Sequence, residues 1–133
     1  MANNIFIDTN IVLDFLEGHR SGHDRAVELF DRLLGDGYRF VILEDTLSTL
    51  YYIARNKDKV LDFIVYARRA WEIVPFGGTV IDEAVNFARS HNTDLEDTLQ
   101  CMAAKYHGCA SIVTSDQTFV DCGVRIVDYA AFV

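Results

Sequence analysis

The sequence has few of the features that divide a chain into parts or carry it across a membrane. It contains one proline among 133 residues and no tract rich in Gly, Ser or Pro, so we expect no linker and no disordered segment. No apolar run approaches the length that crosses a bilayer, and Asn3 and Asn4 stand where a secretion signal would be basic. We therefore expect one soluble, cytoplasmic domain over residues 1–133, without membrane contact.

Cysteine and positive charge are also scarce. Cys101, Cys109 and Cys122 are odd in number, lack CxxC spacing and lie in apolar surroundings, which favours reduced, packed thiols over a disulfide or a metal site. Twelve Lys and Arg residues against twenty Asp and Glu residues give a net charge of −8. A field of that sign repels nucleic acid, so a nucleic-acid ligand would need a local basic patch or bound cations.

Short apolar segments alternate with amphipathic ones along the chain. Strands are expected at 4–8, 39–43, 73–75, 110–114 and 124–127. Helices are expected at 10–17, 24–35, from 45 onward, at 57–71 and 79–90, and from 93 to Gly108. This alternation predicts the fold class: an α/β three-layer sandwich with a mainly parallel central sheet flanked by helices.

Local signals predict how some of these helices begin and pack. Asp24 is expected to cap the helix that follows the loop at 19–23. Thr93 and Glu96 have the spacing of a capping box. Apolar residues at helical spacing are expected to be buried: Val27, Phe30, Leu33 and Leu34 in one helix, Leu47, Leu50, Tyr51 and Ala54 in another, and Leu95, Leu99, Met102, Ala103 and Tyr106 in the last.

Aspartates follow two of the expected strands. Asp8 ends the first strand and Asp116 follows the fourth, while Asp94, Glu96 and Asp97 fall in the first turn of a helix. Ligands of open α/β sheets collect outside the carboxyl ends of the strands. Two carboxylates about 4 Å apart repel by about 4 kcal/mol at an effective dielectric near 20, so such a cluster requires a cation or protons.

A cluster of this kind predicts a specific chemistry. Carboxylate oxygens without nearby Cys or His are ligands for Mg²⁺ or Mn²⁺. Such an ion would activate a water and stabilise the charge on a phosphoryl group. Structural roles are the alternatives: Asp8 and Asn10 as helix caps, Asp97 as a favourable charge in a first turn, and Asp116 as a turn former.

Three stretches resemble the PIN-domain family, which includes the VapC-type toxins of toxin–antitoxin pairs. They are DTNIVLDFL at 8–16, TLSTLYYIAR at 46–55 and LEDTLQCMAAKYHGCASIVTSDQTF at 95–119. The last two resemble the subgroup in which NIYYILR replaces the commoner ELLYVLR. The resemblance covers nearly the whole chain in order. It implies an α/β sandwich, a Mg²⁺- or Mn²⁺-dependent ribonuclease, a small antitoxin partner and a homodimer.

The resemblance also assigns residues. Asp8, Asp97 and Asp116 match the family's catalytic, metal-binding aspartates, and Asn10 matches the polar residue two positions after the first. Asp116 belongs to the TxD motif, here Thr114-Ser115-Asp116.

The chain departs from the family's pattern at two positions. Thr49 occupies the position of a metal-coordinating glutamate, for which Asp45, Asp94 or Glu96 would have to compensate. Thr118 occupies the position of a second common aspartate.

Basic residues gather in one segment. Arg55, Lys57, Lys59, Arg68 and Arg69 are five of the twelve basic residues and lie within fifteen positions. They form either a patch for an RNA backbone or a solvated helix face.

The function expected from these residues is a divalent-metal-dependent endoribonuclease, the toxin of a toxin–antitoxin pair. One rival is a degenerate PIN domain that binds RNA or a protein without catalysis, which the loss of an acid at Thr49 favours. A second rival is an aspartyl-phosphate phosphatase, because Asp8-Thr9-Asn10 resembles a DxD motif. That chemistry needs a second aspartate where this chain has Asn10.

Overall fold

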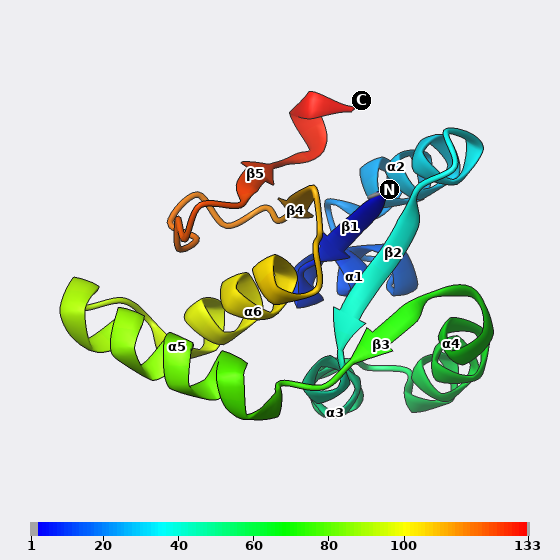
Figure 1. Ribbon diagram of the computed structural model, residues 1–133. Helices are drawn as coiled ribbons and strands as arrows, with labels where there is room; N and C mark the ends of the chain where they lie inside the picture. The colour runs from blue at the N-terminus through cyan, green and yellow to red at the C-terminus, as the bar shows by residue number, and fades with distance from the viewer. Residues whose placement is uncertain (1–2, 133) are drawn as a thin grey trace.

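A five-stranded parallel sheet forms the centre of the molecule (Figure 1). The computed structural model describes residues 3–132. The strands are β1 (Asn4–Ile7), β2 (Arg39–Leu43), β3 (Glu72–Val74), β4 (Ser111–Val113) and β5 (Arg125–Val127), in the order β3-β2-β1-β4-β5. Every neighbouring pair is parallel, which confirms the expected α/β sandwich.

Within residues 3–132, six helices lie between the first four strands and one short turn follows the last strand. They are α1 (Thr9–Leu16), α2 (His23–Gly35), α3 (Glu44–Ile53), α4 (Lys57–Ala70), α5 (Gly77–His91), α6 (Leu95–Tyr106) and a 3₁₀ turn, η1 (Tyr129–Ala131), which the sequence analysis did not predict. Within residues 3–132, no helix is both long enough and apolar enough to span a bilayer.

Alternate strand residues face two separate cores. Ile5 and Ile7 of β1 pack with α1, α2 and α4 on one face of the sheet. Phe6, between them, packs with α5 and α6 on the other face. Successive side chains of a strand point to opposite faces, so a strand buried on both sides reads as an unbroken apolar run.

The central strand places the site. β1 pairs with β2 on one side and with β4 on the other, where Ile7 lies opposite Val113. The Asp8 N–H continues this ladder by donating to the Val113 carbonyl at 3.0 Å. The chain reverses its direction of winding between β1 and β4, and α/β sheets open a ligand crevice at such a point.

The helix caps differ from the expected ones. The side chain of Asp94, not of Thr93, caps α6 by accepting from the Asp97 N–H at 3.0 Å. Thr93 still belongs to the end of α5, because its N–H donates to the Ala88 carbonyl after Asn92 turns into the left-handed region. The expected Thr93 capping box is therefore wrong. Asp24 lies inside the first turn of α2 and does not cap it.

Several residues expected in the core are exposed. Leu95 is 48 % and Tyr106 is 60 % exposed at the two ends of α6. The helix instead buries the side that carries Thr98, Cys101 and Ala104. Val27, Leu34 and Tyr51 are exposed as well. Helical spacing locates an apolar stripe, but the width of the covering sheet decides how much of the stripe is buried.

The cysteine prediction is wrong for two residues. Cys101 of α6 and Cys122, in the loop before β5, form a disulfide with their Cα atoms 6.2 Å apart. Packing around the second core brings them together, and neither their number nor their spacing indicated it. Cys109 is a free, buried thiol whose pKa is raised to about 12, chiefly by burial.

Candidate active site

Asp8 lies at the carboxyl end of β1 and is only 5 % exposed. Its extended backbone caps α1, and its carboxylate accepts from the Thr9 N–H at 2.8 Å and from the Thr114 hydroxyl at 2.7 Å. Burial raises its pKa despite these hydrogen bonds. The capping role and the position in the crevice are therefore combined in one side chain.

Thr114 connects the ends of β1 and β4. Its hydroxyl donates to Asp8 and accepts from the Asp116 N–H at 3.1 Å. Asp116 in turn accepts from the N–H and the hydroxyl of Thr118, at 2.9 and 2.8 Å. These two hydrogen bonds, the backbone one first, lower the pKa of Asp116. Thr118, which occupies the position of another aspartate in the family's pattern, thus favours the ionised form of Asp116.

Asp97 faces the same crevice from the first turn of α6. Its pKa is raised to about 6, first by burial and then by the negative charges of Asp94, Asp8, Asp116 and Glu96. The charges of Asp8 and Asp116 therefore act on Asp97. We call the carboxyl edge of the sheet that carries these three expected aspartates the acidic crevice.

No basic side chain neutralises this crevice through an ion pair among the described residues. The ion pairs within residues 3–132 join Arg20, Arg32 and Arg39 to other acids. That part of the chain also contains no group of three His, Cys, Asp or Glu side chains close enough to enclose a metal ion. Mg²⁺ commonly takes one or two carboxylates and keeps several waters, so the acidic crevice fits a hydrated divalent cation.

A cavity of about 380 Å³ is lined by Thr9, the residue after Asp8, and by Glu96, the residue before Asp97. Thr49 and Asp45 of α3 line it together with Thr9 and Gln100. Thr49 donates to the Asp45 carbonyl at 3.2 Å and supplies no carboxylate. No pattern in the sequence singled out Gln100, although it belongs to the EDTLQ stretch that resembles the PIN family.

Two of the supporting residues are exposed. Asn10 is exposed in the first turn of α1, and Asp94 is exposed at the cap of α6. Asp94 acts on the crevice through its cap of Asp97 and through its charge.

The basic segment does not gather at the crevice. Lys57 donates to the carbonyls of Tyr51, Tyr52 and Ala54, which end α3. Arg68 and Arg69 end α4, just before β3 begins, so they lie at the opposite edge of the sheet from Asp8. Arg125 of β5 is different, because it lines a cavity of about 310 Å³ together with Asp116.

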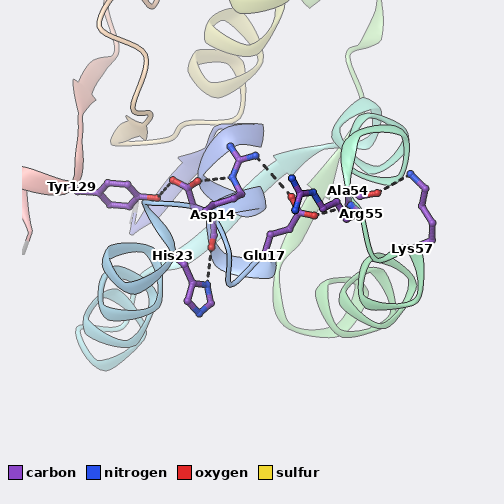
Figure 2. Close-up of polar contacts among 8 residues, drawn as sticks. Asp14, Glu17, His23, Ala54, Arg55, Lys57 and Tyr129 are labelled. Atoms are coloured by element: carbon purple, nitrogen blue, oxygen red, sulfur yellow. Dashed lines mark hydrogen bonds and ion pairs between the residues drawn. The ribbon is translucent and has the colours of Figure 1, made fainter.

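A second polar network fixes the far end of α1 (Figure 2). The buried Asp14 carboxylate accepts from Tyr129 and from Arg20, both at 2.7 Å. Glu17 accepts from the Arg55 N–H at 2.7 Å. A Cβ on Gly22 would lie 2.2 Å from Asp14, so only glycine fits there. The network ties α1 to η1 and to the segment between α3 and α4.

The parallel sheet, its flanking helices and the aspartates at its carboxyl edge define this chain as an α/β sandwich protein with a candidate acidic site at the switch point of the sheet. More specifically, the chain belongs to the PIN domain family, whose model matches residues 5–124. It is 28 % identical over 135 residues to Ribonuclease VapC1 of Aquifex aeolicus (strain VF5). The aligned region covers 98 % of this chain and 94 % of that relative.

Solved structures share the fold. A toxin–antitoxin complex from Klebsiella pneumoniae matches with a TM-score of 0.73 and 16 % identity, over 94 % of this chain and 97 % of the other. The Mycobacterium tuberculosis VapC20, described as a toxin that cleaves the sarcin–ricin loop, matches with a TM-score of 0.70 and 14 % identity. That match covers 90 % of this chain and 95 % of the other.

Proposed function

We propose that this chain is a divalent-metal-dependent endoribonuclease and the toxin of a toxin–antitoxin pair. The observation that carries the proposal is that burial and the charges of Asp8 and Asp116, among others, raise the pKa of Asp97, while no ion pair among the described residues neutralises any of the three aspartates. Membership of the PIN family and the similarity to a protein named as a ribonuclease support the reaction class.

The residues of the proposed metal site have different roles. Asp8, Asp97 and Asp116 would hold Mg²⁺ or Mn²⁺, one or two of them directly and the rest through the ion's waters; the ion when bound supplies an activated water and stabilises charge on the phosphoryl group. Thr114 sets the position of Asp8 relative to Asp116. Thr118 keeps Asp116 charged. The substrate phosphate completes the shell, as is usual for Mg²⁺ sites with few protein ligands.

Cleavage of a labelled RNA in Mg²⁺ tests this proposal. Asp8→Asn should slow cleavage by at least about 100-fold, because it removes a ligand on which the other two depend. Asp82→Asn, at an exposed position of α5, is the matched control and should leave the rate unchanged. Equal rates for Asp8→Asn and the wild-type chain would refute the catalytic assignment.

A specific observation favours a second candidate, a degenerate domain that binds without cutting. Thr49 occupies the position of a metal-coordinating acid, and its hydroxyl donates a hydrogen bond to the Asp45 carbonyl. This candidate is distinguished by RNA that binds to the wild-type chain but stays intact at saturating Mg²⁺ and Mn²⁺.

We propose that the antitoxin docks in the apolar groove between α2 and α4. This groove of about 570 Å³ is lined by Phe30, Phe63, Tyr66 and Trp71, among others, and fits one face of an amphipathic helix. The solved complex that shares this fold supports such a partner. The fluorescence of Trp71, the only tryptophan, should change when the protein encoded beside this chain is added. Tyr66→Glu should weaken that binding, while Tyr106→Glu on α6 should not.

A second copy of the chain is the other partner we propose. Tyr52 and Ile53 are exposed on α3 and supply apolar surface for it. Sedimentation velocity should give a dimer, and a monomer at micromolar concentration would refute it.

A further inference from the structure

The cavity of about 380 Å³ beside α3 and α6 has no role in the proposed function so far. Thr9, which lines it, is bonded to Asp8, and Glu96, which also lines it, is bonded to Asp97. The lining of the cavity therefore begins one residue away from two of the three aspartates.

Much of the wall of this cavity is apolar. Phe76 and Leu99 contribute to it, and both also pack against the second core. Leu95 lines the same cavity and is 48 % exposed, although its spacing along α6 predicted burial. Ligand pockets are lined mainly by apolar and aromatic side chains, and nucleobases stack on aromatic ones. Such a wall suits a planar ring.

The polar groups of the cavity offer acceptors more than donors. The Thr49 hydroxyl donates to the Asp45 carbonyl at 3.2 Å. The Thr9 and Thr46 hydroxyls contact each other at 3.5 Å. Among residues 3–132, the side-chain carboxylates of Asp45 and Glu96 take part in no hydrogen bond or ion pair. Two carboxylates are therefore available to a ligand that carries N–H groups.

A buried amide adds to this excess of acceptors. Gln100 is 5 % exposed and lines the cavity, and its Oε1 has no hydrogen-bond partner within the described part of the chain. Native proteins rarely leave a buried acceptor unpaired without a reason. The lining contains no Lys, Arg or His, so a phosphate would be repelled, whereas an uncharged ring with N–H donors would not.

Guanine is the nucleobase whose edge matches these acceptors. Its Watson–Crick edge presents the N1–H and N2–H₂ donors side by side, and a carboxylate accepts such a pair as it accepts the paired N–H groups of arginine. Uracil presents one N–H between two carbonyl oxygens. Adenine and cytosine place an acceptor nitrogen beside their amino group. Those acceptors would face the carboxylates and be repelled.

We propose that this cavity binds a guanine base of the RNA substrate, packed against Phe76 and Leu95 and recognised by the carboxylates of Asp45 and Glu96. The inference rests on the proposed function, since the RNA is the one whose phosphate the neighbouring aspartates would cleave. It adds to that function a preferred base beside the cleaved bond.

Free nucleosides test the cavity without metal and without cleavage, because they carry no phosphate. Guanosine at up to about 1 mM should shift the amide NMR signals of Leu95 and Leu99 in the ¹⁵N-labelled chain. Inosine lacks only the N2 amino group and should bind about tenfold more weakly, as expected for one hydrogen bond to a charged group. Uridine should leave these signals in place. Guanosine that shifts them no more than uridine does would refute the inference.

Two double variants separate the two carboxylates from a general effect of charge. Asp45→Asn with Glu96→Gln should weaken guanosine binding by at least about tenfold. Glu44→Gln with Asp82→Asn makes the same change of charge at exposed positions outside the cavity and should bind guanosine as the wild-type chain does. Equal guanosine affinities of the two double variants would overturn the inference.

A basic side chain of a protein partner is the other ligand that an acidic cavity admits. N-acetylargininamide is the probe for it. If this compound shifted the Leu95 and Leu99 signals at a lower concentration than guanosine does, the cavity would belong to a protein interface and the inference would be wrong.

RNA cleavage separates this inference from the proposed function. In Mg²⁺, a labelled RNA with one guanosine among uridines should be cut beside the guanosine, and inosine at that position should lower kcat/KM by about tenfold. Equal cleavage of the two RNAs would refute the guanine preference and leave the nuclease intact. Guanosine binding without cleavage of any RNA would refute the nuclease and leave a guanine-binding cavity.

Discussion

Thr114→Val is the substitution that most directly probes how the crevice is assembled. Thr114 is 1 % exposed, and its hydroxyl donates to the Asp8 carboxylate at 2.7 Å and accepts from the Asp116 N–H at 3.1 Å. Valine keeps the shape and the strand preference but makes neither bond. A hydrogen bond to a charged group contributes about 1.5–3 kcal/mol and a neutral one about 0.5–1.5 kcal/mol. We expect the free energy of unfolding to fall by about 2–4 kcal/mol.

The measurement is urea denaturation of the metal-free chain, with Thr79→Val, at an exposed position of α5, as the control. In a separate thermal denaturation, the Tm of Thr114→Val should be lower by about 3–5 °C for each kcal/mol lost in a chain of this size. The loss should be smaller near pH 4 than near pH 7, because a protonated Asp8 depends less on the Thr114 hydroxyl. A Thr114→Val chain within about 0.5 kcal/mol of wild type at both pH values would show that the hydroxyl does not hold the two aspartates.

Three further predictions follow from the same contacts. The Asp97 carboxyl of the metal-free chain should titrate near pH 6 by NMR. Because the pKa of Asp97 is raised in the folded state, the wild-type chain should lose stability relative to Asp97→Asn as the pH rises from about 4 to about 6. An NMR titration midpoint of Asp97 near pH 4 would contradict this. Thr49→Glu should tighten Mg²⁺ binding by about tenfold in calorimetry, since position 49 lines the cavity beside Gln100, and an unchanged affinity would favour the non-catalytic candidate. Reduction of the Cys101–Cys122 disulfide should lower the free energy of unfolding by about 3 kcal/mol in guanidinium, whereas identical midpoints with and without dithiothreitol would mean that these cysteines are thiols.

Much of the fold could be predicted from the sequence because its strands are short, apolar and regularly separated by helices. The expected strand at 39–43 matches β2 residue for residue, and those at 4–8 and 124–127 differ from β1 and β5 by one terminal residue. The aspartates that follow β1 and β4 could be found for the same reason. A carboxylate directly after an apolar strand is conspicuous, and a parallel sheet brings such strand ends to one edge.

Side-chain partners far apart in the sequence could not be predicted. Thr114 and Asp8 are separated by 106 residues, and their hydrogen bond depends on the register of β1 against β4. The Cys101–Cys122 disulfide likewise depends on how the loop before β5 folds over α6. Gln100 could not be singled out from the sequence, because the burial of its side-chain oxygen depends on how α6 packs against the sheet.

Calorimetric titration of Mg²⁺ and of Mn²⁺ into the purified chain, with Asp8→Asn measured alongside, tests the central claim most directly. The acidic crevice should give saturable binding of at least one of these ions in the wild-type chain and none in Asp8→Asn. If neither ion bound the wild-type chain up to about 10 mM, where binding contributes less than about 3 kcal/mol, Asp8 would be a helix cap and the crevice would not be a metal site.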